Sequence, residues 1–182
     1  MKNLISDKDE EYRRLKALAE YRILGTEPES CYDDITQIAA RTCHVPISLM
    51  TLVDKDRQWF KSKVGFQTTE TRRDWSFCTH AIKENIPLIV NDAYQDKRFI
   101  NNPLVTGDPK IRFYAGFPLK NNDGNKLGTL CVIDRKPGSL DEEQCSIMEL
   151  LAKQIVSFLE LRKRSLNLLD ALSHLHNQEG IL

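Results

Sequence analysis

Residues 72–119 of the chain read RRDWSFCTHAIKENIPLIVNDAYQDKRFINNPLVTGDPKIRFYAGFPL. Aromatic, cationic and thiol side chains stand there between short apolar segments, and much of the stretch follows neither the helical nor the strand period. An ordered connection of this length inside a compact domain is typically a binding surface or a core plug. We therefore expect the functional site in this stretch and its scaffold in the flanking sequence.

The scaffold is predicted from apolar periodicity on both sides of that stretch. The predicted elements are helices at 9–24 and 29–43, strands at 47–53 and 57–64, a short helix at 77–85, strands at 87–92, 110–120 and 126–135, and a helix from 140 to about 175. Turn signals at 54–56 and 121–125 make hairpins of the strands beside them. This order is typical of an antiparallel sheet with segregated helices, the α+β class.

The same periodicity assigns side chains to faces. Ile35, Ile38 and Ala39 in the second helix are expected to turn inward. Ile111 is expected to share a strand face with the apolar alternation that follows it, which places Arg112 and Tyr114 on the opposite face.

Composition and charge indicate one globular unit with few macromolecular partners. A chain of 182 residues can bury one core, and two full domains would be cramped. The 26 basic and 26 acidic residues cancel, so nucleic acid and anionic membranes have no electrostatic basis as partners. No apolar run approaches the roughly 20 residues that span a bilayer. An acidic N-terminus unlike a signal peptide and five cysteines without a CxxC pair favour a cytoplasmic location.

The last helix is predicted to be longer than the domain that it closes. Ser139 and Glu142 are expected to form its capping box. It would measure roughly 50 Å at 1.5 Å per residue, whereas a domain of this size is about 30–35 Å across. An apolar stripe runs along it through Ile147, Leu151, Phe158, Leu161, Leu168, Leu172 and Leu175. A second copy of the helix would cover the projecting part; alternatively, residues 166–175 fold back or fray.

Taken together, these segments resemble the GAF domain family over residues 32–161. The matching motifs are VPISLMTLVDKDRQWFKS (45–62), SFCTHAI (76–82), PLIVNDAYQDKRFINNPLV (87–105), IRFYAGFPLK (111–120) and DGNKLGTLCVID (123–134). The likeness is to the type that stands before histidine kinase and diguanylate cyclase domains. It implies a central antiparallel sheet of five to seven strands, with N- and C-terminal helices packed on one face and a pocket on the other.

The resemblance also implies a role and a domain organisation. We expect an N-terminal helix for dimerisation or packing at 1–28, a GAF domain at 29–162 and a C-terminal helical extension at 163–182. The family implies a non-catalytic sensory and regulatory domain that binds a small molecule. Its signal would pass through the terminal helices of a homodimer to a partner protein or output domain. A filled pocket would instead leave a pure dimerisation module.

The candidate ligand-binding residues lie in the connection and the segments beside it. They are Trp75, Phe77, Cys78, His80, Asp96, Arg98, Phe99, Arg112 and Tyr114. Arg98 and Arg112 stand among aromatic residues, where a guanidinium can hold a carboxylate or phosphate through two hydrogen bonds. The alternative for both is an ion pair with Asp92 or Asp96 that only fixes the connection.

Cys78 provides the main alternative function, a thiol-based redox enzyme or sensor. The free methionine-R-sulfoxide reductases also resemble GAF domains, and they use cysteines around the short helix and the loop after it. Residues 91–110 contain no cysteine, so the second thiol that disulfide chemistry needs is missing from the expected place. The simpler interpretation of Cys78 is a small buried thiol with a packed His80 nearby.

No bilin or metal cofactor is expected, and the ligand stays unidentified. Bilin-binding relatives attach the chromophore to a cysteine usually followed by histidine, in a region that reads DPKIRFYAG here (108–116). The signature of cyclic-nucleotide-binding members is not recognisable. His174 and His176 lie two apart on a predicted helix, which is a poor geometry for chelation.

Overall fold

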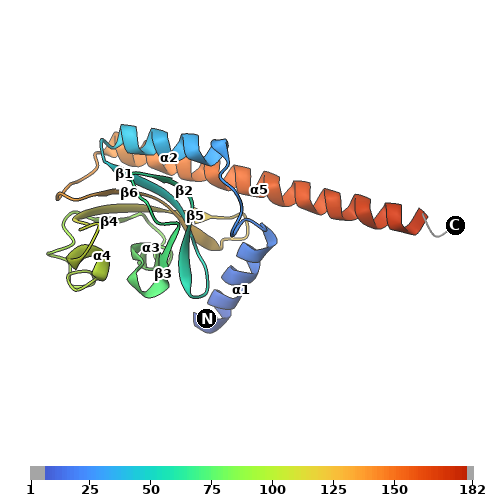
Figure 1. Ribbon diagram of the computed structural model, residues 1–182, viewed down its shortest axis with the longest axis horizontal. Helices are drawn as coiled ribbons and strands as arrows, with labels where there is room; N and C mark the ends of the chain where they lie inside the picture. Colours follow the sequence, from blue (N-terminus) through green and yellow to red (C-terminus); the bar gives the residue numbers. More distant parts are fainter. Residues whose placement is uncertain (1–6, 180–182) are drawn as a thin grey trace, which may run out of the picture.

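The computed structural model describes residues 7–179 and has one antiparallel sheet with helices on both faces (Figure 1). The six strands stand in the order β3-β2-β1-β6-β5-β4. They are β1 Ile47–Val53, β2 Arg57–Val64, β3 Glu70–Arg72, β4 Leu88–Val90, β5 Phe113–Lys120 and β6 Lys126–Asp134. The helices are α1 Asp7–Glu20, α2 Ser30–Thr42, the 3-10 turn η1 Arg73–Trp75, α3 Phe77–Ala81, α4 Pro103–Thr106 and α5 Glu142–Glu179. The expected α+β class and the range of five to seven strands are confirmed.

The two central strands, β1 and β6, are buried on both faces because helices or loops cover both sides of the sheet. Their register places Thr51 opposite Thr129 and Leu52 opposite Gly128. A Cβ atom on Gly128 would stand 1.9 Å from the carbonyl oxygen of Thr51. Only glycine therefore allows the two central strands to approach this closely.

Helices α1, α2 and α5 cover one face of the sheet and share a core that we call the helical core. This confirms the expected packing of the terminal helices on one face. The helices and the residues that follow α1 and α2 contribute Ala17, Leu18, Tyr21, Ile23, Tyr32, Ile35, Ala39, Cys43, Met148, Ala152, Ile155 and Leu159. The sheet contributes Met50, Leu52, Trp59, Phe113, Ala115, Phe117, Leu119, Leu127, Leu130 and Val132.

A buried lysine ties the connection between α1 and α2 to the sheet. The Lys61 ammonium donates to Thr26 Oγ1 at 2.7 Å, to the Glu27 carbonyl at 2.6 Å and to Glu29 Oε1 at 2.7 Å. Arg162 of α5 also donates to Glu29 Oε1, at 2.9 Å. One carboxylate thus joins β2, the connection and the long helix, and the buried charge has a complete set of partners.

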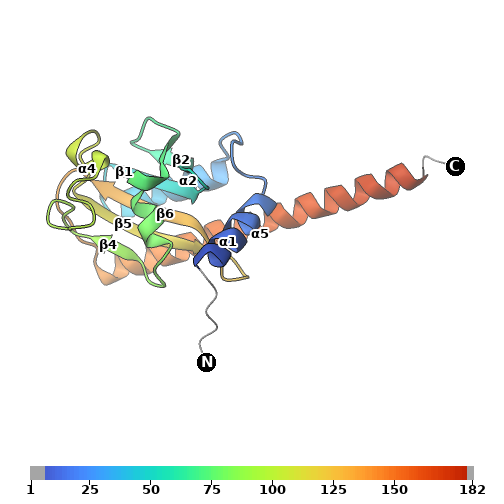
Figure 2. The same ribbon diagram turned by 90° about the horizontal axis from the view of Figure 1, so that it is seen from below.

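The opposite face is covered by α3, α4 and the irregular connection, and we call its interior the connection core (Figure 2). It consists of Ile47, Leu49, Val53, Phe60, Phe77, Cys78, Ala81, Ile82, Leu88, Val90, Ala93, Phe99, Leu104, Val105, Ile111, Tyr114, Cys131 and Ile133. Most of the predicted site residues lie in or beside this core.

Two predicted side-chain orientations are wrong. Ile38 is 48% exposed, because α2 buries only a narrow stripe. Ile111 packs in the connection core and not with the face of β5 that it was assigned to. The strand begins two residues later, at Phe113, and Lys110 has a left-handed backbone that breaks the alternation. The three-residue strand β3 was not predicted, since it is too short to show a period.

Helix α5 has 38 residues, about 57 Å, and leaves the domain as one continuous helix (Figures 1 and 2). Its capping box is not Ser139 with Glu142. Asp141 Oδ1 accepts from the Gln144 amide at 2.7 Å and Gln144 Oε1 from the Asp141 amide at 3.0 Å. No helix in residues 7–179 is long and apolar enough to cross a membrane.

The apolar residues of α5 divide between the sheet and solvent. The stripe that enters the helical core is Met148, Ala152, Ile155 and Leu159. The exposed apolar residues past the sheet are Leu161, Leu168, Leu169, Leu172 and Leu175, between 54% and 62% exposed. Residues 166–175 do not fold back, because α5 continues through them to Glu179.

Candidate ligand-binding site

Helix α3 is held against the sheet by its flanking residues. Ser76 caps it as predicted, because the Ser76 hydroxyl oxygen accepts from the Thr79 amide at 3.0 Å. The same hydroxyl bonds to the Gln58 side chain of β2. On the other side, the Asn102 amide donates to the Trp75 carbonyl at 2.8 Å, which joins α4 to the residue before the cap. These bonds orient Cys78 toward the central strands.

The Cys78 thiol is fully buried among polar groups. The hydroxyl of Tyr114 lies 3.2 Å from its sulfur and that of Thr129 lies 3.1 Å away. Burial acts to raise the pKa of Cys78, but hydrogen bonding by Cys131, Thr129, Thr51 and Tyr114 outweighs it and lowers the pKa. The pKa of Cys131 is raised by its burial and by the neighbouring Cys78.

A glycine makes room for the tyrosine that contacts this thiol. Tyr114 lies on β5, and its ring crosses the position two residues along the strand, where Gly116 stands. A Cβ atom on Gly116 would lie 2.1 Å from the Tyr114 hydroxyl oxygen. The Tyr114 side chain can therefore reach Cys78 only because residue 116 has no side chain.

The aromatic candidates form a stack that fills much of the connection core. The rings of Phe77 and Phe99 are parallel within 9° at a centroid distance of 3.9 Å, and Tyr114 lies 5.0 Å from Phe77. His80 meets the Phe99 ring edge-on at 4.9 Å. Burial first, and then the charges of Lys83 and Arg98, lower the pKa of His80. A neutral imidazole thus packs here as one wall of the stack.

A small cavity remains between the stack and the sheet. It has about 20 Å³ of space for a water-sized molecule, which is room for one. Its lining includes Gln58, Thr71, Cys78, Tyr114 and Cys131. Within the described residues, the Thr71 hydroxyl is buried without a hydrogen-bond partner. This cavity therefore has polar groups as well as an apolar wall.

An open groove of about 470 Å³ lies directly outside the cavity. Phe66, Thr71 and Leu104 line both spaces, so one layer of side chains separates them. Trp75 lines the groove, with the Arg72 guanidinium 5.5 Å from its ring centroid. Phe66 and Leu104 are the apolar side chains that line both spaces.

The two arginine candidates are paired inside the connection. Arg98 donates to Asp96, at 2.6 Å and 3.0 Å for its nearest contacts. Arg112 makes two parallel bonds of 2.8 Å to Asp92 and lies 4.1 Å from the Tyr94 ring centroid. Both ion pairs match the alternative in which these arginines fix the connection. Neither arginine lines the small cavity.

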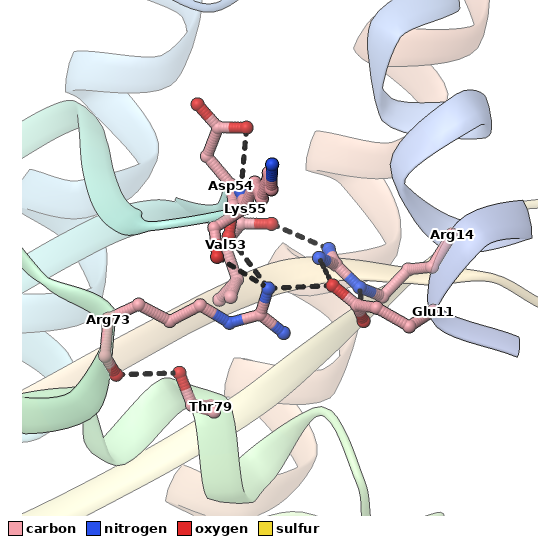
Figure 3. A network of polar contacts seen from close by, with 7 residues as sticks. All are labelled: Glu11, Arg14, Val53, Asp54, Lys55, Arg73 and Thr79. Atoms are coloured by element: carbon pink, nitrogen blue, oxygen red, sulfur yellow. Dashed lines mark hydrogen bonds and ion pairs between the residues drawn. The ribbon is translucent and has the colours of Figure 1, made fainter. Parts of the chain in front are cut away.

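A polar network connects this face of the domain to α1 (Figure 3). The Glu11 carboxylate accepts from Arg14 at 2.8 Å and from Arg73 at 2.6 Å. Arg73 also donates to the carbonyls of Asp54 and Lys55, and its own carbonyl accepts from the Thr79 hydroxyl at 3.2 Å. A continuous set of contacts therefore runs from α3, the helix that carries Cys78, to α1.

The structure brings together part of the predicted set. Phe77, Cys78 and Tyr114 line the cavity, and Phe99 stacks behind them. Trp75 lines the outer groove, whereas His80, Asp96, Arg98 and Arg112 line neither space.

Sequence reasoning missed several cavity residues, and their signals were weak. Cys131 lies on a segment predicted only as a central strand, as does Thr129, which contacts Cys78 without lining the cavity. Gln58, Phe66 and Thr71 line the cavity from outside the connection. A polar residue such as Thr129 inside an otherwise apolar strand is the signal that could have indicated them. Among residues 7–179, no group of three metal-ligating side chains comes together.

Comparisons with known proteins agree with this architecture. The sequence model of the GAF domain matches residues 27–158. The chain is 36% identical, over 171 residues, to a cyclic di-GMP phosphodiesterase from Pseudomonas aeruginosa. That match covers 93% of this chain and only 29% of the relative's length.

Solved structures resemble the fold at low sequence identity. The GAF domain of an Acinetobacter phosphoenolpyruvate-protein phosphotransferase superposes with a TM-score of 0.60 at 15% identity, over 90% of this chain and 99% of that one. A free methionine-R-sulfoxide reductase from Neisseria meningitidis, in complex with its substrate, gives 0.61 at 19%, over 88% and 95%. These likenesses concern the fold alone. The sheet order, the two cores and the match over residues 27–158 together establish that the chain belongs to the GAF domain family, a family of sensory domains.

Proposed function

We propose that this GAF domain is a non-catalytic regulatory module that binds a small molecule and acts through the terminal helices of a homodimer. The observation that carries the proposal is that α5 is buried against the sheet along one part of its length and exposed along the other. Its first half packs on the sheet, and its second half projects with leucines exposed on one side. A helix of this kind is suited to connect the domain with a second copy and with an output.

The exposed leucines follow a heptad pattern. Leu161, Leu168 and Leu175 are seven residues apart, and Leu172 lies between the last two at four-three spacing. These spacings give the alternating a and d positions of a coiled coil, with Ser165 as a polar interruption. A parallel partner helix would bury the stripe, which otherwise leaves large apolar side chains in water. We propose that residues 10–24 also contribute to the dimer interface, beside residues 139–175.

The cavity and α5 are connected through one strand. Along β5, Tyr114 faces the cavity, while Phe113, Ala115 and Phe117 face the helical core that α5 closes. A ligand that displaces Tyr114 would move the same strand on which α5 packs. The contacts from α3 through Arg73 to Glu11 offer a second connection, to α1. Two packings of the terminal helices would then differ in ligand affinity.

The ligand is proposed to occupy the cavity and the outer groove together. The closed cavity admits only about one water molecule, whereas the adjoining groove has about 470 Å³. The nine predicted residues remain the candidates, with Phe77, Cys78, Phe99 and Tyr114 inside and Trp75 at the rim. His80, Asp96, Arg98 and Arg112 would act by holding the connection, and no bilin or metal is proposed.

We do not propose a reductase activity. Residues 91–110 contain no cysteine, although the free methionine-R-sulfoxide reductases that the fold resembles use cysteines in this region. We therefore propose binding without catalysis.

We propose that the domain regulates cyclic di-GMP turnover. In support, the chain matches 29% of the length of a cyclic di-GMP phosphodiesterase. The catalytic unit would stand in the same polypeptide or in a partner protein. We propose a cytoplasmic domain with an N-terminal helix within 1–28, the GAF domain at 29–162 and a C-terminal helical extension within 163–182; residues 1–6 and 180–182 of these ranges lie outside the described residues. The matched range 27–158 supports the middle part.

Light scattering after size exclusion tests the dimer. The chain of 21.0 kDa should elute at twice that mass, and the double variant Leu168→Lys with Leu172→Lys should elute as a monomer. Asn167→Lys adds one positive charge outside the stripe and should remain dimeric. A wild-type monomer at about 100 µM would contradict the proposal, as would equal masses for the double variant and the wild type.

Native mass spectrometry of protein purified from cells tests the ligand. A reproducible extra mass, absent from the denatured spectrum and lost in Tyr114→Ala, would support binding in the cavity. Protein without extra mass that also shows no thermal shift with a metabolite library would instead indicate a pure dimerisation module.

A further inference from the structure

Two thiols meet in the connection core although the sequence separates them widely. Cys78 lies on α3 and Cys131 on the central strand β6, and both line the same cavity of about 20 Å³. Both are buried, at 1% and 0% exposure, and both are free. The second thiol that is missing from residues 91–110 is therefore supplied by a different element.

The surroundings of the pair are polar on one side. The Tyr114 and Thr129 hydroxyls lie 3.2 Å and 3.1 Å from the Cys78 sulfur. Such donors stabilise a thiolate more than a thiol, because a thiolate accepts several hydrogen bonds. Cys131 shares fewer of these donors and stays protonated more readily. The two thiols are thus unequal, as an attacking and a resolving thiol need to be.

The small cavity gives the pair room for a small reactant. Both cysteines line it, and its space of about 20 Å³ suits one molecule near the size of water. Phe66 and Leu104 separate it from the open groove, so a side-chain movement suffices to admit a small oxidant. A larger oxidant would be excluded.

We propose that Cys78 and Cys131 form a redox-active dithiol that hydrogen peroxide converts to an internal disulfide. This modification goes beyond the ligand binding proposed above, and it lies in the same cavity. The Cys78 thiolate attacks one peroxide oxygen, so that an S–O bond forms, the O–O bond breaks and hydroxide leaves to become water. Cys131 then attacks the sulfenic sulfur, the S–S bond forms, the S–O bond breaks, and the departing hydroxide takes the Cys131 proton.

The balance is two thiols and one peroxide giving one disulfide and two waters. A dithiol reductant restores the thiols by exchange. The disulfide would join α3 to β6 and remove the Tyr114 contact to a thiolate. Oxidation would thereby change the wall of the cavity and the strand next to α5.

The test is peroxide treatment of the reduced full chain, followed by alkylation under denaturing conditions and intact-mass and peptide analysis. The wild type has five cysteines. It should lose two hydrogens, retain three alkylatable thiols and yield a peptide pair linked through residues 78 and 131. Cys131→Ala should form no such link and should carry a dimedone-trapped sulfenic acid at Cys78.

Cys145→Ser is the matched control. Cys145 lies near Cys43, at the junction of α2 and α5, and its loss should leave the Cys78–Cys131 link unchanged. Retention of all five thiols at peroxide doses that oxidise a small free thiol would overturn the proposal. A link only between Cys43 and Cys145, or between two chains, would overturn it as well.

A second variant separates this chemistry from misfolding. Tyr114→Phe keeps the ring but removes one donor to the Cys78 sulfur. Its circular dichroism should match the wild type, whereas the pH midpoint of its oxidation rate should rise and the rate at pH 7 should fall several-fold. An unchanged pH profile would refute the role of the hydroxyl groups in activating Cys78.

Discussion

Replacing Glu11 by Gln removes one negative charge from between two guanidinium groups and keeps the shape of the side chain. The carboxylate accepts two bonds of 2.8 Å from Arg14 and one of 2.6 Å from Arg73. Arg14 is buried, so it depends on this carboxylate and on the Val53 carbonyl for its partners. The change should therefore destabilise the attachment of α1 to the sheet.

The magnitude follows from the pKa of Glu11. Burial acts to raise it, but the bonds and charges of Arg14 and Arg73 outweigh burial and lower it from 4.5 to about 2. That difference corresponds to about 3.4 kcal/mol of folding free energy if it acts in full. The Glu11 side chain is 34% exposed, however, and solvent screens part of the interaction. We expect a loss of about 1–2 kcal/mol in the free energy of unfolding.

The pH dependence distinguishes this ion pair from a general effect of the substitution. Because the pKa of Glu11 is lower in the folded than in the unfolded state, its stabilisation is complete above pH 4.5 and declines as the pH falls toward 2. The difference in stability between wild type and Glu11→Gln should thus be largest at pH 7. Roughly 40% of it should remain at pH 3.

Urea unfolding followed by tryptophan fluorescence and circular dichroism measures both quantities. Curves at pH 7, 5, 4 and 3 are compared at one protein concentration, since dimerisation also contributes to stability. Glu10→Gln removes an exposed charge from the same turn of α1 and should change stability by less than about 0.5 kcal/mol. A Glu11→Gln variant as stable as the wild type at pH 7, or a difference that does not change with pH, would refute the reasoning.

Three further substitutions test the fold and the cavity. Gly128→Ala places a Cβ atom 1.9 Å from the Thr51 carbonyl oxygen and should lower the free energy of unfolding in urea by more than about 3 kcal/mol. Gly25→Ala has open space around it and should lower that free energy by only about 1–2 kcal/mol, because the backbone of residue 25 is left-handed. Lys61→Met removes the buried ammonium from three acceptors and should lower stability by about 2–4 kcal/mol in the same assay, and a neutral result would show that the buried charge is not required. Phe66→Ala should open the cavity to the groove, so that a maleimide reagent labels Cys78 at least tenfold faster without unfolding; an unchanged labelling rate would show that another side chain closes the cavity.

The sequence by itself determined the elements and most of their inward faces. Alternation in the strands and the three-four spacing in α5 are local properties, and burial of apolar side chains then leaves few ways to pack them. The GAF resemblance added the packing of the terminal helices on one face of the sheet, which is confirmed. The length of the apolar stripe predicted the long helix α5. Its capping box is formed by Asp141 and Gln144 and not by Ser139 and Glu142, because the Gln144 side chain accepts from the Asp141 amide.

The tertiary structure alone decided which polar groups meet. Cys131 reaches Cys78 because the register of β6 turns residue 131 to the same face as residues 129 and 133, and no local period relates it to α3. Arg112 could bind an anion or pair with Asp92, and only the path of the connection selects the pair. That path depends on distant backbone bonds, such as that of the Arg112 amide to the Asp134 carbonyl at 2.9 Å. Contacts between segments far apart in the chain form only when the whole sheet assembles, so the sequence could not fix them locally.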